Sequence, residues 1–275
     1  MTIHLGFDMG IRNLAYCLIQ HDISGVRKVL AWDNIDLLEG GISSQDSKSC
    51  YGCGVKAIWC DESNKWCNAC ASGVRRKKSV LHKPSLPLLT CATNVKELRP
   101  LAISRGWEHA RTAKKTDLLD WAKGHYLMPW TPVKAKDTSL ETIFHAMNTW
   151  LNSVLPTFKT ATLIRLENQP VMKGPTMKSV QIMLYTLLNY RLRHEYGWNG
   201  RIEFVHAGTK SKNNAINVDV SGVSESEAYR NRKKTAETDV IELLTKAEHT
   251  TWLTFFNSRT KKSDLADSFL MAYRL

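Results

Sequence analysis

The C-terminal stretch Arg259–Tyr273 constrains the fold of this chain more than any other part of its sequence. Ser263 is a suitable helix N-cap, and apolar residues recur after it at helical spacing. Asp264 and Asp267 then lie one turn apart on a stripe that Met271 continues, so the helix is apolar nearly all round and is expected to be buried. The apolar positions are Leu265, Ala266, Phe269, Leu270 and Tyr273. Two acids on a buried helix need a partner, and a divalent cation is the natural one.

Two further carboxylates end predicted strands. Apolar residues alternate along Ile3–Asp8, and a second run, Ala161–Glu167, stops before Asn168-Gln-Pro. If the two strands are adjacent and parallel, both acids emerge on one rim of the sheet. Clustered acids repel one another unless cations are bound, and hard oxygen ligands suit Mg²⁺ or Mn²⁺. The predicted metal ligands are Asp8, Glu167, Asp264 and Asp267. Taken singly, each has a simpler interpretation, as a hairpin-closing, solvated or helix-capping acid.

The remaining pattern predicts an α/β fold with a mixed five-stranded sheet flanked by helices. A turn at Gly10–Asn13 and runs at Leu14–Ile19 and Val29–Leu37 make the first three strands an antiparallel meander. Beyond Ala161–Glu167, the last strand is Arg201–His206. Helices are expected at Leu140–Leu155, ended by Pro156, at Met177–Trp198, and from Tyr229 through Leu244. The second of these has more apolar residues than one sheet contact needs, which indicates a subunit interface.

Two Cys-x2-Cys pairs, Cys50/Cys53 and Cys67/Cys70, match the spacing of a tetrahedral zinc site. Zinc would fold a segment too short to have its own core. Its role would be structural, because four protein ligands leave no open position. Cys60 is either a spare thiol or an alternative ligand, and four free cysteines in a loop are the competing interpretation.

A formal net charge of +12 indicates a polyanionic partner, with nucleic acid first. The sequence contains no apolar segment long enough to indicate a membrane span. A run at Arg75–Lys78 and a polar loop at Ala207–Val223 add basic residues. The predicted DNA-binding residues are Arg75, Arg76, Lys77, Lys78, Lys114, Lys115, Lys210, Lys212, Arg232, Lys233, Lys234 and Lys261.

Residues 93–122 predict a helix, a turn and a second helix, with Leu98, Ala102, Leu118, Leu119 and Ala122 as the facing apolar residues. This segment resembles the SAP motif, a small DNA-binding unit, through Lys96-Glu-Leu-Arg, Arg105-Gly-Trp and Lys114-Lys-Thr-Asp-Leu-Leu. Ala113 stands where the motif usually has glycine. The alternative is an ordinary helical hairpin packed against the core.

Four segments of the chain resemble the RuvC-like Holliday junction resolvases, in the poxviral and fungal mitochondrial branch of the ribonuclease H-like superfamily. They are Gly6-Phe-Asp-Met-Gly-Ile-Arg-Asn-Leu-Ala15, Ile164-Arg-Leu-Glu-Asn-Gln169, Tyr229-Arg-Asn-Arg-Lys-Lys-Thr-Ala236 and Lys261-Lys-Ser-Asp-Leu-Ala-Asp-Ser-Phe-Leu270. The resemblance implies a ribonuclease H-like nuclease core at 1–38 and 140–275. Within it lie a zinc-binding insertion at 39–80 and a SAP-like insertion at 90–128, which are not usual for the viral members.

The same resemblance implies a homodimer that nicks opposite strands of branched DNA, a four-way junction, and leaves 5′ phosphates. Two Mg²⁺ (or Mn²⁺) per active site would bind the four carboxylates, with Lys261 or Lys262 near the scissile phosphate, and Lys262 as the catalytic one. Lys233 and Lys234 would contact backbone phosphates.

Three alternatives use the same residues differently. A ribonuclease H or transposase-type nuclease would act on another substrate, and a non-catalytic junction-binding protein would use only the zinc and SAP-like parts. The turn Gly6-Phe-Asp-Met-Gly10 also resembles that of actin-like ATPases, which need a second Gly-rich phosphate loop that is not found here. The chain opens directly on strand pattern, so we expect an intracellular protein without secretory signal or transit peptide. That start favours a viral setting, in host cytoplasm or nucleus.

Overall fold

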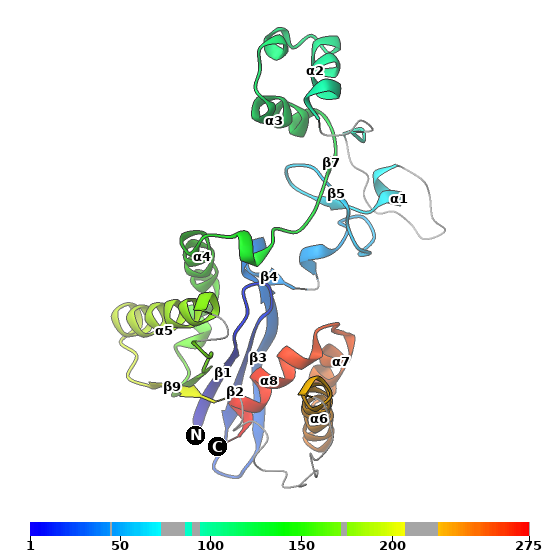
Figure 1. Ribbon diagram of the computed structural model, residues 1–275. Coiled ribbons are helices and arrows are strands. Elements are labelled where there is room, and N and C mark those ends of the chain that lie inside the picture. The colour runs from blue at the N-terminus through cyan, green and yellow to red at the C-terminus, as the bar shows by residue number, and fades with distance from the viewer. Residues whose placement is uncertain (45, 73–85, 90–93, 172–174, 207–224, 275) are drawn as a thin grey trace. The chain divides into compact units, whose positions relative to one another are not determined.

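The computed structural model describes the chain except for residues 45, 73–85, 90–93, 172–174, 207–224 and 275. The chain forms two compact units (Figure 1), which we call the core unit, Met1–Gln45 with Lys134–Leu275, and the inserted unit, Asp46–Val133. Within the described ranges, no helix combines the length and the apolar character that crossing a membrane requires.

A mixed six-stranded sheet forms the centre of the core unit, in the order β4-β3-β2-β1-β8-β9. The strands are β1 (Thr2–Asp8), β2 (Leu14–His21), β3 (Arg27–Asp36), β4 (Ile42–Ser43), β8 (Leu163–Glu167) and β9 (Arg201–Val205). The predicted antiparallel meander of the first three strands is confirmed, and β1, β8 and β9 are parallel. The sequence predicts five strands rather than six, because two-residue β4 is too short to show a period-two pattern.

One face of the sheet is covered by α4 (Leu140–Phe158) and α5 (Pro175–Tyr196), as Figure 1 shows. The Ser139 side chain caps α4 by accepting from the backbone N–H of Thr142 at 3.1 Å. The prediction that Pro156 ends this helix is wrong. Proline removes one backbone donor, but the last turn still forms because it buries Leu155 and Phe158, which are 0% and 1% exposed. The short helices η1 (Leu37–Glu39) and η4 (Ala135–Asp137) belong to the same unit.

The other face carries α6 (Glu225–Lys246), α7 (Thr250–Ser258) and α8 (Lys262–Tyr273), packed around Trp32. The Trp32 ring stacks on Phe256, with centroids 5.3 Å apart, and its Nε1 donates to the Leu265 carbonyl at 3.2 Å. The predicted burial of α8 is confirmed, but the helix begins at Lys262, so Ser263 is not its N-cap. Helix α7 has no counterpart among the sequence predictions.

Gly6 lets α8 lie directly on β1. A Cβ at this position would meet the Ser268 carbonyl oxygen at 2.5 Å and the Ala272 backbone nitrogen at 2.8 Å. Both atoms belong to a helix backbone, which cannot move away as a flexible side chain could. The close approach therefore requires glycine here.

The inserted unit combines a small sheet with a helical pair. Strands β5 (Trp59–Cys60), β6 (Lys65–Trp66) and β7 (Met128–Pro129) pair antiparallel in the order β6-β5-β7, beside η2 (Asp46–Lys48) and α1 (Asn68–Ala71). The predicted helix, turn and helix are confirmed as α2 (Val95–Ser104), η3 (Glu108–Arg111) and α3 (Lys115–His125). Of the facing residues, Leu98, Ala102, Leu118 and Ala122 are buried and Leu119 is partly buried.

Arg99 braces the turn of this helical pair. Its Nη1 donates to the Ala110 carbonyl at 2.6 Å and its Nη2 to the Ala113 carbonyl at 2.9 Å. A guanidinium that satisfies the carbonyls of a turn has a structural role, so we do not count Arg99 among the candidate DNA contacts.

Candidate active site and metal centre

Asp8 and Glu167 end two neighbouring parallel strands at the same end of the sheet. Phe7 of β1 is in register with Leu166 of β8, so the two acids occupy the next position on each strand. Asp8 is 9% exposed and Glu167 is partly buried. Gln169 Nε2 donates to Glu167 Oε2 at 3.0 Å. The condition that these strands be adjacent and parallel is therefore met.

Both carboxylates lie on the face of the sheet that α8 covers. Gly6 and Arg165 are paired in register, and both contact α8. Side chains alternate between the two faces along a strand, so residues two positions further on point to the same side. Asp8 and Glu167 are those residues.

Asp264 and Asp267 approach the same end because α8 runs antiparallel to β1. Near the C-terminus of the helix, the Ala272 carbonyl lies 2.9 Å from Nε2 of His21, which pairs with the first residue of β1. The first turn of α8 is therefore directed toward the strand end that carries Asp8. Asp264 and Asp267 are both partly buried there.

The structure brings these acids to one end of the sheet, but their oxygen atoms are not close enough together to form a complete metal site. Among the residues that the structure describes, one group of three or more His, Cys, Asp or Glu side chains has ligand atoms close enough for a shared ion, and it consists of cysteines. The carboxylate site stays a prediction, and its donor chemistry fits Mg²⁺ or Mn²⁺.

Lys233 reaches from α6 to the first turn of α8. Its Nζ donates to Ser263 Oγ at 3.2 Å and lies 3.8 Å from Asp264 Oδ1. Ser263 Oγ in turn donates to Asp264 Oδ1 at 3.0 Å. The predicted DNA contact at Lys233 is thus attached to one of the predicted metal ligands.

The other predicted basic residues are divided between the two units, and several lie outside the described residues. Lys262, predicted to be catalytic, has its Nζ 5.9 Å from the centre of the Phe256 ring. The exposed members of the predicted set are Arg232, Lys234 and Lys261 in the core unit and Lys114 and Lys115 in the inserted unit. The remaining ones lie outside the described residues: Arg75, Arg76, Lys77, Lys78, Lys210 and Lys212.

Four cysteines form a compact cluster in the inserted unit. The sulfur atoms of Cys50, Cys53, Cys67 and Cys70 all lie within 4.8 Å of one another, and the Cys53 and Cys67 sulfurs are 3.6 Å apart. Tetrahedral zinc with Zn–S bonds of about 2.3 Å requires sulfur atoms about 3.8 Å apart. The predicted set of four ligands is confirmed as a cluster that fits a metal such as zinc. Cys60 lies in β5 and is not one of the four.

Local structure explains why these thiols meet. Cys67 caps α1, with its sulfur 3.4 Å from the Cys70 backbone nitrogen. Gly54 takes a φ of 74°, a left-handed turn that closes the first pair. Burial raises the pKa of the Cys70 thiol, and the three neighbouring cysteines raise it further. A bound metal would offset this by stabilising the thiolates.

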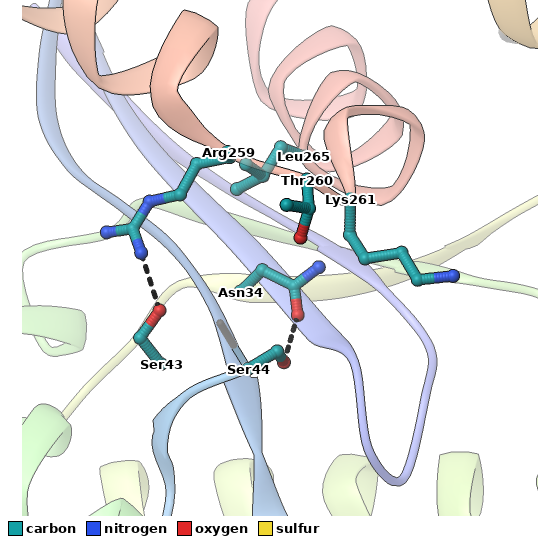
Figure 2. Close-up of a pocket in the computed structure, with 7 residues that line it drawn as sticks. All are labelled: Asn34, Ser43, Ser44, Arg259, Thr260, Lys261 and Leu265. Carbon is teal, nitrogen blue, oxygen red and sulfur yellow. Dashed lines mark hydrogen bonds between the residues drawn. The ribbon is translucent and has the colours of Figure 1, made fainter. Parts of the chain in front are cut away.

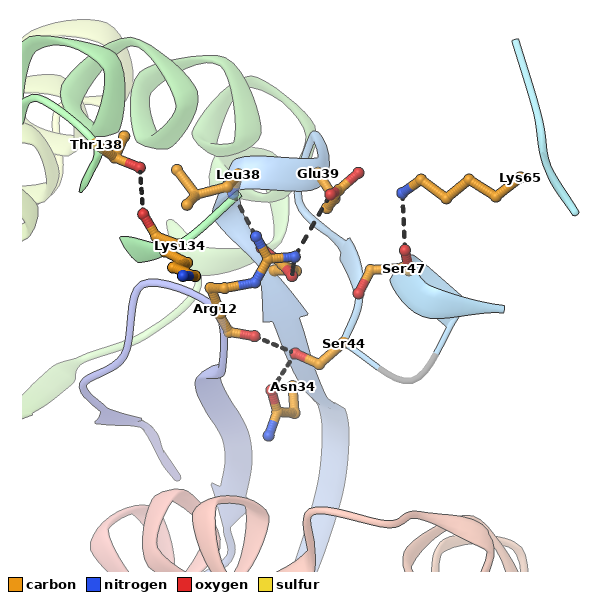
Figure 3. A network of polar contacts seen from close by, with 10 residues as sticks. Arg12, Asn34, Leu38, Glu39, Ser44, Ser47, Lys65, Lys134 and Thr138 are labelled. Atoms are coloured by element: carbon orange, nitrogen blue, oxygen red, sulfur yellow. Dashed lines mark hydrogen bonds and ion pairs between the residues drawn. The ribbon is translucent and has the colours of Figure 1, made fainter. Parts of the chain in front are cut away.

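A buried ion pair holds the turn that follows Asp8. Arg12 Nη2 lies 2.6 Å from Asp36 Oδ2 and 3.4 Å from Glu39 Oε1 (Figure 3). The Asp36 side chain is 0% exposed. Ser44 Oγ lies 2.8 Å from the Arg12 carbonyl oxygen, which places the segment after β4 against the same turn. The end of β1 is therefore fixed from two sides.

A polar pocket beside the first turn of α8 was missed in the sequence. Its lining is drawn in Figure 2 and consists of Asn34, Ser43, Ser44, Arg259, Thr260, Lys261 and Leu265. Only Lys261 belongs to the predicted set. The available signal was Asn34, a polar residue inside the apolar run Val29–Leu37, at a position two residues after buried Trp32 and therefore on the same face.

No family model matches the chain, and no curated protein sequence matches it. A solved structure matches with a low TM-score, so the function is inferred below from the residues of this chain. The chain is similar to the crystal structure of the yeast mitochondrial Holliday junction resolvase Ydc2, with 14% identity, 98% of this chain and 77% of that chain covered, and a TM-score of 0.42.

Proposed function

We propose that the chain is a structure-selective DNA endonuclease that resolves four-way (Holliday) junctions by metal-dependent hydrolysis. The observation that carries the proposal is the parallel register of β1 and β8. It brings Asp8 and Glu167 to adjacent positions, at the sheet end toward which the first turn of α8 is directed. The net charge of +12 suits a polyanionic substrate.

In this proposal the ligands of two Mg²⁺ or Mn²⁺ ions come from the sheet and from α8. Asp8 and Glu167 are held by strand pairing, and Asp264 and Asp267 by the burial of α8. Bound ions would supply an activated water and charge stabilisation for the leaving 3′ oxygen. The task of the protein is to keep the four carboxylates on one side of the sheet and to admit the backbone phosphate.

Lysines at the start of α8 and along α6 would receive the DNA strand. Lys261 and Lys262 precede the first predicted ligand of the helix, so we assign Lys262 to the scissile phosphate and Lys261 to the DNA backbone beside it. Lys233 and Lys234 would contact backbone phosphates, which gives affinity and salt dependence rather than sequence choice. Lys114 and Lys115 of the inserted unit would add contacts of the same kind, and the zinc site of that unit would have a structural role only.

Cleavage of opposite strands would require two active sites, and we propose a homodimer formed through α5. Ile182 and Tyr190 on this helix are 45% and 60% exposed. They lie eight residues apart, on one exposed stripe of the helix that also carries Thr186. A two-fold dimer presents the same site twice, which suits a junction with two equivalent strands.

A ribonuclease H or transposase-type nuclease would use the same acids and is the main competitor. The test is cleavage by the full-length protein of a mobile four-way junction, a flap, a plain duplex and an RNA–DNA hybrid, with Mg²⁺ or with EDTA. Both strand pairs carry labels. We expect paired nicks on opposite strands of the junction, only with Mg²⁺. Preferred cleavage of the hybrid would favour ribonuclease H, and junction binding without cleavage would favour a non-catalytic protein.

Asp264→Asn connects this activity to the site. The variant is expected to bind junctions and to lose cleavage by about a thousandfold, because one carboxylate contributes several kcal/mol of charge stabilisation through the metals. Asp22→Asn is the matched control, since Asp22 follows β2 at the opposite end of the sheet. Unchanged cleavage by Asp264→Asn would remove this residue from the mechanism.

A further inference from the structure

The pocket of Figure 2 lies in the same row of the sheet as the predicted active site. Asp8 pairs with Ala15 of β2, and Ala15 pairs with Asn34 of β3. Residues paired across antiparallel strands point to the same face, so the side chains of Asp8 and Asn34 both lie on the α8 side. Two strand spacings put their backbones roughly 10 Å apart.

Asn34 is a buried amide with an unsatisfied donor directed into the pocket. The residue is 4% exposed, and its Oδ1 accepts from Ser44 Oγ at 2.6 Å. Among the residues that the structure describes, none is a hydrogen-bond partner of its Nδ2. In Figure 2 this nitrogen faces the segment of Thr260 and Lys261, with the Thr260 hydroxyl pointing toward Asn34. A buried donor without a partner is unfavourable by about 1–3 kcal/mol, which an incoming acceptor would recover.

Arg259 also lines this pocket and is held in place by several contacts. Its guanidinium lies over the Phe255 ring at 4.4 Å, and its Nη1 donates to Ser43 Oγ at 2.7 Å. Nη2 lies 3.8 Å from Asp33 Oδ1, so one acid partly offsets its charge. The Nε is buried and has no hydrogen-bond partner within the described part of the chain. Together with Lys261, the pocket therefore has two cations, one neighbouring acid and two unused buried donors.

We propose that this pocket binds a backbone phosphate of the DNA strand that is cut, next to the scissile phosphate. The inference rests on the proposed function and extends it to a second site. Phosphate oxygens are the acceptors that a fixed guanidinium, an amide and a lysine recognise together. A contact of this kind sets the register of the strand on the protein and reads no base. Asn34 and Asp8 lie in the same row of the sheet, so a phosphate bound at Asn34 would align the DNA strand across the carboxylates.

The test is binding of junction DNA in EDTA, so that no cleavage is needed. Neutral methylphosphonate groups replace single phosphates along the strand, one position at a time. We expect the wild-type protein to lose about tenfold in affinity at one position next to the cut, because a hydrogen-bonded ionic contact is lost there, besides the positions that other lysines contact. Arg259→Gln should lose its sensitivity at that one position and keep it at the others. The same pattern of sensitive positions in both proteins would overturn the pocket.

Two further variants separate charge from hydrogen bonding. Lys28→Gln removes an exposed cation of β3 and is the matched control for Arg259→Gln. Arg259→Gln should reduce the slope of log affinity against log salt by about 0.9, as expected for one phosphate contact. Asn34→Asp keeps an acceptor for Ser44 and replaces the donor by a charge, so its affinity should fall. Unchanged or higher affinity would overturn the proposal.

Failure of this inference can be told from failure of the proposed function. Wild-type protein that binds no junction overturns both. Wild-type protein that binds and cuts junctions, with Arg259→Gln equal to Lys28→Gln in affinity and salt dependence, overturns the pocket alone. Thermal melting of each variant shows whether it is folded, and the methylphosphonate scan of the wild-type protein needs no variant.

Discussion

The cysteine cluster and the carboxylate set are two candidate metal sites built in opposite ways. The four cysteines lie within residues 50–70, and their sulfur atoms are already within 4.8 Å of one another. The four carboxylates come from positions 8 to 267, and only the register of β1 and β8 and the direction of α8 bring them to one end of a sheet. A site with nearby ligands depends on local turns, whereas a distributed site depends on the whole fold.

The difference also separates the chemistry that the two sites can perform. Four thiolates fill the coordination sphere of zinc, so the cluster can stabilise structure but offers no open position. Carboxylates at the rim of a sheet leave room for water and for a phosphate oxygen. The site whose ligands are already close together is the one proposed to be structural, and the site that remains open is the one proposed to be catalytic.

The largest effect should come from removing one cysteine ligand. Cys70→Ser is expected to lose its zinc and to unfold the region around the cluster, since structural zinc contributes about 10–16 kcal/mol in small zinc-binding peptides. Zinc content by elemental analysis and hydrogen exchange of residues 46–72 measure this. Cys60→Ser is the control and should retain zinc. Zinc retained by Cys70→Ser, or lost by Cys60→Ser, would contradict the assignment of the four ligands.

The second effect should be confined to activity. Asp8→Asn is expected to reduce junction cleavage by about a thousandfold while zinc content stays the same, because only the carboxylate site is altered. The melting temperature should be unchanged or higher, since one of several neighbouring negative charges is removed. A large loss of stability would show that Asp8 is mainly structural.

Acid should weaken the core unit through two buried histidines at the far end of α8. The rings of His4 and His21 lie 4.3 Å apart. Burial lowers the pKa of His4 from 6.5 to about 4, with added lowering from His21 and Arg165, and burial also lowers the pKa of His21. The unfolded chain then binds more protons than the folded one between these values. Stability from His4 is therefore present above pH 6.5 and is lost, by about 3 kcal/mol, as the pH falls toward 4.

Hydrogen exchange of β1 amides from pH 7 to pH 4.5 measures this loss apart from the inserted unit. His4→Gln should flatten the profile, because its side chain does not titrate. A wild-type profile as flat as that of the variant would contradict the prediction. Zinc release in acid, which follows protonation of the thiolates, would be seen separately in the inserted unit.

The smallest effect tests the contact that supports the distributed site. Gly6→Ala is expected to destabilise the core unit by about 1–3 kcal/mol, because the added methyl group meets the backbone of α8. Cleavage should fall with it as the helix shifts. Gly124→Ala is the control, since nothing lies within 4 Å of a Cβ there, and alanine in α3 should stabilise slightly. Urea denaturation of both variants gives the comparison, and an unaffected Gly6→Ala protein would mean that α8 adjusts freely.

The sequence alone was sufficient for several features whose signal is local. Period-two alternation identified β1 and β8, helical spacing predicted the buried α8, and the Cys-x2-Cys spacing identified the four clustered thiols. The acids at the strand ends could also be recognised, because the last residue of a strand lies at the rim of the sheet. Each of these features depends on residues that are close together in the sequence.

Tertiary structure decided which segments, far apart in the sequence, pack against each other. No pattern in residues 1–8 or 163–167 specifies that the two strands pair in parallel, because pairing depends on which buried faces meet. The pocket of Asn34 and Arg259 was missed for the same reason, since its residues come from β3, β4 and the segment before α8. The continuation of α4 through Pro156 also depended on a distant partner, the core that buries Phe158. Contacts between distant segments are selected by packing of the whole core, and local sequence does not contain that information.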